Sequence, residues 1–318
     1  MSGAKDFAWT KTYMALADKL ADYRYNRREL IEKIAEAFAA VGMKMPVLEK
    51  DSYPEDMDPF TVFGVFSKNL KSANRQLLLK FFANVFGIDT EVPDRFTGLP
   101  ILNTFGAAFY ALKGERGEKD IDNLWETFVA SLELAKDASP PNRAKFSAAF
   151  DQAQTQKKVK WNLTIGLFWV RPWFFMNLDE PGRRFFMKHL AKSPEFANDD
   201  VNLKAAPSGE KYLALCDKCR QAFARGSSGL PSFPEISAKS WKDVPSAPKK
   251  GRWNSAGTSD ADDLEKPAAE REEGEKENDS RTEIYDKAAF LADTFLESED
   301  YDALADILEH KYNLILQG

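Results

Sequence analysis

One polar stretch divides the chain into two parts of different character. Residues 251–280, GRWNSAGTSDADDLEKPAAEREEGEKENDS, are mostly small, polar and charged. A segment of this kind buries too little apolar area to offset the entropy that it loses on ordering. We therefore predict a disordered acidic linker over residues 237–282, a folded recognition module over residues 5–236, and a short separate element over residues 283–318.

The net charge of −6 hides an uneven distribution along the chain. Residues 254–283 carry eleven acidic and four basic side chains, a net charge of −7, so the rest of the chain carries about +1. Residues 143–192 carry ten Lys and Arg against three acidic side chains, a net charge of +7. A basic, aromatic-rich block inside an acidic protein is the first indication of function.

The module shows the apolar periodicity of amphipathic helices. Apolar residues recur every three or four positions up to Gly42, again up to Gly87, and from Asp120 along DIDNLWETFVASLELA. The first of these segments fits two helices or one interrupted helix. The stretch FTVFGVFSKNL, residues 60–70, fits a buried strand or a buried helical turn, and periodicity alone does not decide between them. We predict a mainly α-helical, multi-helix module.

The C-terminal residues 283–318 are predicted to form two helices and then one strand, NLILQG, that runs into Gly318. A phosphate-binding P-loop has this form: a strand runs into the loop G-x-x-x-x-G-K-[ST] and then a helix, and the glycines let backbone N–H groups wrap the phosphates. Gly318 would be the first glycine of such a loop. Here the stretch YDALADILEHKYNLILQG resembles the entry to the AAA+ motor of McrB-type proteins, the nucleotide-hydrolysing subunits of modification-dependent restriction systems. The stretches DPFTVFGVFSKNL, VPDRFTGLPILN, DIDNLWETF and LTIGLFWVRPWFFMNLD resemble the N-terminal region of one McrB-like subgroup.

This resemblance implies that residues 283–318 begin a truncated α/β AAA+ domain, in which Gly318 belongs to the nucleotide-binding loop. It implies a parent protein that binds GTP or ATP with Mg²⁺, assembles as a ring and couples to a partner nuclease subunit. The Walker A lysine, the Walker B acid and the arginines of the motor would all lie beyond Gly318. We therefore expect this chain by itself to hold no cofactor and to hydrolyse no nucleotide.

The basic block is the best candidate for a binding surface, because Lys and Arg neutralise phosphates and aromatic faces stack on unpaired or flipped bases. The alternative is that the aromatic side chains belong to the core and the cations form a solvated face. The candidate nucleic-acid-binding residues are Lys157, Lys158, Lys160, Trp169, Arg171, Trp173, Arg183 and Arg184.

No catalytic or metal-binding residue is predicted. Cys216 and Cys219 form a lone C-x-x-C on the apolar stripe of a predicted helix, which indicates buried thiols rather than a zinc site. His189 and His310 stand alone. So few Cys and His favour a reducing cytoplasm, and no apolar run approaches the roughly 18 residues of a membrane span.

The sequence thus predicts a module that recognises DNA, with a modified base as one candidate target, for a McrB-like antiviral restriction system. The alternative is a protein-interaction module that docks a partner nuclease subunit or a phage component without touching DNA.

Overall fold

The computed structural model describes residues 7–242 except 47, 49–53, 69, 103–106, 198, 200 and 228. Within these residues the chain forms ten α-helices and no strand; a single parallel bridge joins Lys68 and Leu102. The prediction of a mainly α-helical module is therefore confirmed. Residues 243–318, which include most of the predicted linker, the predicted AAA+ element and Gly318, lie outside the described part.

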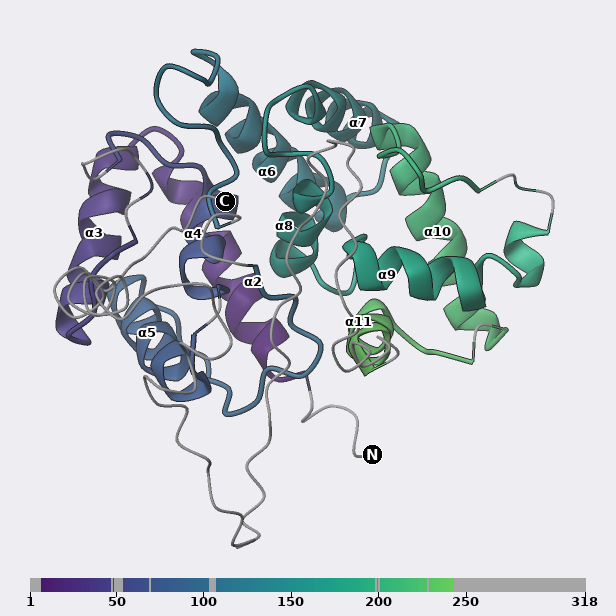
Figure 1. Cartoon of the computed structure of the whole chain (residues 1–318), viewed down its shortest axis with the longest axis horizontal. Helices are drawn as coiled ribbons and strands as arrows, with labels where there is room; N and C mark the ends of the chain where they lie inside the picture. The colour runs from purple at the N-terminus through teal and green to yellow at the C-terminus, as the bar shows by residue number, and fades with distance from the viewer. Residues whose placement is uncertain are drawn as a thin grey trace, which may run out of the picture. The chain divides into compact units, whose positions relative to one another are not determined.

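Four helices build the first half of the module (Figure 1). The segment before Gly42 is two helices rather than one, joined through a 3₁₀ turn at Ala21–Tyr23. The helices before Gly42 and Gly87 end as predicted, since both glycines have a left-handed φ, +68° and +61°. The four helices are α2 (Trp9–Leu20), α3 (Arg27–Ala40), α4 (Pro59–Phe66) and α5 (Ser72–Val85).

The second half contains six helices, two of them shorter than ten residues. Between α9 and α10 lie a π-helical turn at Phe186–Leu190 and a 3₁₀ turn at Pro194–Phe196. The six helices are α6 (Asp120–Lys136), α7 (Pro140–Gln154), α8 (Asn162–Val170), α9 (Glu180–Phe185), α10 (Gly209–Arg225) and α11 (Phe233–Lys242).

The predicted module boundary at residue 236 falls inside α11 and is too early. Phe233 and Ile236 are buried, and so are the side chains of Ser237 and Ser240 one turn later. The helix packs against α9 and extends to Lys242. This packing stabilises the part of the helix that lies beyond residue 236. A buried helix face that contains serine is not recognised from apolar periodicity, because serine counts as a polar residue.

Helix α4 is the centre of the first half. All eight of its residues are buried, so the stretch that periodicity left open is a buried helix and not a strand. Figure 1 shows α4 and α2 between the pair α3 and α5 on one side and the pair α6 and α8 on the other. Aromatic rings fill the contacts, with ring centroids 5.6 Å apart for Phe60 and Phe109 and 5.1 Å apart for Phe66 and Phe82.

Asp58 starts this buried helix. Its carboxylate accepts hydrogen bonds from the backbone N–H groups of Phe60 (2.8 Å) and Thr61 (3.0 Å), and Pro59 follows at the first helical position. The Thr61 hydroxyl accepts in turn from the backbone N–H of Phe109 at 2.9 Å. Because burial disfavours the charged form, the pKa of Asp58 is raised from 3.8 to about 6.

A carboxyl group whose pKa is raised by folding stabilises the fold below its unfolded pKa, and this contribution is lost as the pH rises through its folded pKa. The substitution Asp58→Asn keeps a capping oxygen but removes the titration. We expect the unfolding free energy of the wild type, minus that of Asp58→Asn, to fall by about 2.4 kcal/mol between pH 4 and pH 7. Urea unfolding at a series of pH values measures this difference. The exposed Glu118→Gln is the matched control, and a difference that stays flat for Asp58→Asn would contradict the prediction.

Candidate nucleic-acid interface

An open groove of about 740 Å³ lies between α9, with the turn that follows it, and the irregular segment 201–204. Two of the predicted residues, Arg183 and Arg184, line it together with two further cations, Lys188 and Lys204. We call this groove the α9 groove; its lining is Glu180, Arg183, Arg184, Met187, Lys188, Val201, Asn202, Leu203 and Lys204.

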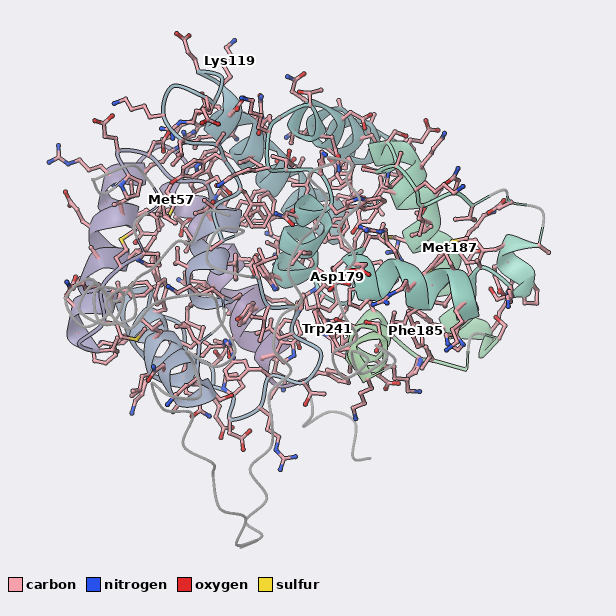
Figure 2. The ribbon with its side chains drawn as sticks, viewed as in Figure 1. Met57, Lys119, Asp179, Phe185, Met187 and Trp241 are labelled. Carbon is pink, nitrogen blue, oxygen red and sulfur yellow. The ribbon has the colours of Figure 1, made fainter. Side chains whose placement is uncertain are left out.

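The start of α9 is held from the loop before it. Figure 2 shows Asp179 at the beginning of this helix, where its carboxylate accepts the backbone N–H of Gly182 at 2.7 Å. Burial raises the pKa of Asp179 above its usual value. Gly182 is required here because a Cβ would lie 2.6 Å from the backbone oxygen of Asn177. The loop and the helix are therefore in close contact, which fixes the direction in which α9 leaves.

The π-helical turn after α9 decides which side chains reach the groove. Phe186 and Leu190 point into the core, whereas Met187 and Lys188 are exposed on the groove side. Figure 2 shows Met187 on this turn. Single π-helical turns occur frequently at functional sites. Here the turn adds one apolar and one cationic side chain to the two arginines of α9.

Arg183 connects the groove to the lysines that precede α8. Its guanidinium group lies 4.1 Å from the centroid of the Trp161 ring, and its Nη1 donates to the backbone oxygen of Leu178 at 3.1 Å. A guanidinium group over an indole face is a favourable cation–π contact. Trp161 follows Lys160 directly, so this one contact joins two basic elements that are separate in the sequence.

The three lysines lie in a tight turn, residues 155–161, which we call the lysine loop. Val159 is fully buried, while Lys157, Lys158 and Lys160 are exposed around it. Lys158 and Lys160 have φ angles of +67° and +26°, a region that side chains other than glycine rarely occupy. This strained backbone buries the side chain of Val159 and leaves a lysine exposed on either side of it.

Trp169 does not belong to this surface. Its side chain is fully buried, its indole N–H donates to the backbone oxygen of Pro100 at 3.0 Å, and its ring packs on Phe63 and Phe109. The prediction of a stacking role for Trp169 is therefore corrected to the core alternative. A large apolar ring inside a helix of eight consecutive buried residues has no open face.

Arg171 is also buried, at 7% exposure, and is corrected from a phosphate-binding to a structural residue. Its Nη1 donates to the backbone oxygen of Val170 at 2.8 Å, and its Nη2 forms an ion pair with Asp18 of α2. These contacts end α8 and attach it to α2.

Of the two predicted tryptophans, Trp169 and Trp173, only Trp173 is exposed, at 47%. Its indole N–H donates to the hydroxyl of Thr10 at 3.3 Å, and its ring stands edge-on against Phe7 at 6.3 Å. It does not line the α9 groove.

Seven of the nine groove residues were not singled out as site residues from the sequence. Lys188 lies in the basic block, but nothing in the local pattern separates it from Lys192. Met187 looks like one more apolar residue among FFM. Lys204 lies in a stretch without periodicity, where no pattern indicates which side chains converge in space.

Cys216 and Cys219 are buried free thiols on α10, as predicted. Burial raises the pKa of Cys216 to about 11, so its thiol is neutral and unreactive at neutral pH. Within residues 7–242, where described, no group of three His, Cys, Asp or Glu could hold a metal ion. None of the helices in that part of the chain combines the length and the apolar character needed to span a membrane.

The fold and the surface define a helical module with a basic groove on one side. The chain belongs to the family described as Domain of unknown function (DUF8425), whose model matches residues 9–243. This match runs from the beginning of α2 to the residue after α11. No curated protein and no solved structure shows significant similarity to the chain.

The strain in the lysine loop gives a stability prediction. The substitution Lys158→Gly relieves the left-handed backbone, and we expect it to raise the unfolding free energy by up to about 1 kcal/mol. Lys157→Gly is the matched control, because Lys157 has no left-handed φ. Glycine there adds entropy to the unfolded chain, at a cost of about 0.5–1 kcal/mol, and removes only a weak surface ion pair with Glu115. Thermal unfolding of both variants measures the effect. Equal destabilisation by the two glycines would contradict it.

Proposed function

We propose that this module binds DNA through a basic surface made of the lysine loop and the α9 groove. The observation that carries the proposal is the contact of Arg183 with Trp161, which brings the two basic elements together. Lysine and arginine side chains on such a surface neutralise phosphates and release counterions, which is the main source of affinity for nucleic acid.

The balance of charge in the groove supports this proposal. Four cationic side chains face one carboxylate, that of Glu180, which lies 3.7 Å from Arg184 as an (i, i+4) pair. The lysine loop adds three lysines, of which Lys157 lies 3.9 Å from Glu115. The excess of positive charge is therefore local and dense, as in an electrostatic footprint for phosphates.

The place of the module in a larger assembly is proposed from the sequence resemblance. In this proposal the module is the recognition part of a McrB-like AAA+ motor that binds GTP or ATP with Mg²⁺ at a loop beginning with Gly318. The parent protein would form a ring through its motor domain and pass the recognition event to a partner nuclease subunit. A modified base is one candidate target of this recognition.

One observation favours a second function, the docking of a partner protein without DNA contact. Trp173 exposes about half of its surface away from the groove, and exposed tryptophans are frequent anchors of protein interfaces. In that case, Trp173→Ala would abolish partner binding, and reversal of the groove charges would leave it unchanged.

The DNA proposal is tested by reversing one groove charge. We expect Arg184→Glu to weaken binding of the intact chain to DNA and to reduce the slope of log Kobs against log salt by about one to two units, because a phosphate contact is lost and a repulsion replaces it. Fluorescence anisotropy at a series of salt concentrations measures both quantities.

Arg28→Glu is a closely matched control. Arg28 is exposed and pairs with Glu32 of α3 at 3.1 Å, again as an (i, i+4) pair, and Figure 1 shows α3 far from α9. It should leave DNA binding and its salt dependence unchanged. Equal effects of the two reversals, or wild-type binding that does not respond to salt, would refute the proposed function.

A further inference from the structure

We infer that the α9 groove accepts single-stranded DNA, with an unpaired nucleotide on its apolar floor, in preference to the side of a duplex. This inference rests on the proposed function and specifies the substrate class of the same site. The observation behind it is that three apolar side chains, Met187, Val201 and Leu203, lie among the cations of the groove.

The apolar floor is accessible to a ligand. Met187 is 41% exposed, one of the few large apolar side chains with that exposure in residues 7–242 as described, and Val201 and Leu203 are half-buried. Covering apolar surface of this kind stabilises a complex only when the ligand places apolar surface of its own on it. A phosphate alone gains nothing from it.

Duplex and single-stranded DNA differ in what they could offer to this floor. The outside of a duplex presents phosphates and sugar edges, while the apolar faces of its bases are stacked inside. An unpaired nucleotide exposes a base face next to its own phosphate. Modules that bind single strands combine a cationic groove with aromatic side chains on which bases stack. In the α9 groove the aliphatic side chains of Met187, Val201 and Leu203 would take the place of those aromatic side chains.

The arrangement of the cations fits the same ligand. Lys188 directly follows the floor residue Met187, and Arg184 lies about one helical turn before Met187. A ligand in the groove could therefore contact apolar and cationic side chains close together. Arg183 is held by Trp161 and by the backbone oxygen of Leu178, so it loses less side-chain entropy when it binds a phosphate. The volume of about 740 Å³ is within the range of compact ligand sites, which suits a short segment of one strand.

An acidic peptide with an apolar residue could also match a cationic groove with an apolar floor. Single-stranded DNA is favoured because the contact of Arg183 with Trp161 brings the lysine loop to the groove, and its three lysines extend the positive charge past it. A polyanion with regularly spaced charges uses such an extension, whereas a short peptide seated in the groove does not.

The test compares a single strand of about 16 nucleotides, the upper range of site sizes for single-strand-binding folds, with the duplex of the same sequence. Anisotropy at constant salt with the intact chain measures both affinities. We expect the single strand to bind about 5-fold more tightly than the duplex, in line with about 1 kcal/mol from covering roughly 40 Å² of apolar surface with a base. Met187→Ser should reduce this preference to near unity by weakening only single-strand binding.

The matched control is Leu77→Ser, which changes a similarly exposed apolar side chain on α5, outside the groove. It should leave the preference unchanged, and thermal unfolding of both variants checks that each is folded. A preference that survives Met187→Ser would overturn the inference.

The remaining outcomes separate this inference from the proposed function. Equal affinity for the single strand and the duplex, with loss of both in Arg184→Glu, would overturn the single-strand inference and leave DNA binding standing. Binding to neither would overturn both. Competition by an acidic peptide of equal charge that outperforms the single strand, and that depends on Met187, would assign the groove to a peptide and overturn the inference.

Discussion

A fully buried helix is the constraint on which this fold depends, because water cannot reach the unpaired backbone groups at its two ends. Helix α4 meets this requirement with one ionisable side chain at each end. Asp58 accepts the N–H groups at its beginning, and Arg75 of α5, itself fully buried, donates Nε–H to the backbone oxygen of Phe66 at its end. The same guanidinium group reaches the backbone oxygen of Lys68 at 3.0 Å. The helices around α4 therefore pack on a helix that has a hydrogen-bonding side chain at each end.

The candidate interface depends on the same way of satisfying buried backbone groups. The connection from α8 to α9 is held from both sides: the Thr164 hydroxyl accepts the N–H of Leu178 at 3.0 Å, and the Tyr212 hydroxyl donates to the backbone oxygen of Met176 at 2.6 Å. Arg171 attaches the beginning of this connection to α2. The connection therefore fixes where α9 begins. Because it is already ordered, ligand binding by the α9 arginines does not require the entropy loss of ordering a loop.

Periodicity predicted most of the helices, since an amphipathic stripe is a local property of the chain. It left the stretch of α4 open, because a helix that is buried on all sides has no polar face to set a period. At the site, the sequence found the basic block but not its geometry. Trp169 and Arg183 look alike as members of that block, yet the first lies in the core and the second at the surface. Lys188 and Lys204 line the same groove from a π-helical turn and an irregular segment, neither of which has a sequence pattern of its own.

The net charge of −6 and a sequence pI of about 5.3 would argue against a phosphate-binding protein if charge acted as a total. Charge does not act as a total, because at physiological salt the interaction between exposed charges is largely screened beyond about 8 Å. A phosphate at the α9 groove therefore responds mainly to the charges that lie close to it, among them Arg183, Arg184, Lys188, Lys204 and Glu180, and not to the net charge as a total. The stacking of Arg183 on Trp161 matters for this reason: it brings the lysine loop to the same surface, and a local field is what a phosphate can sense.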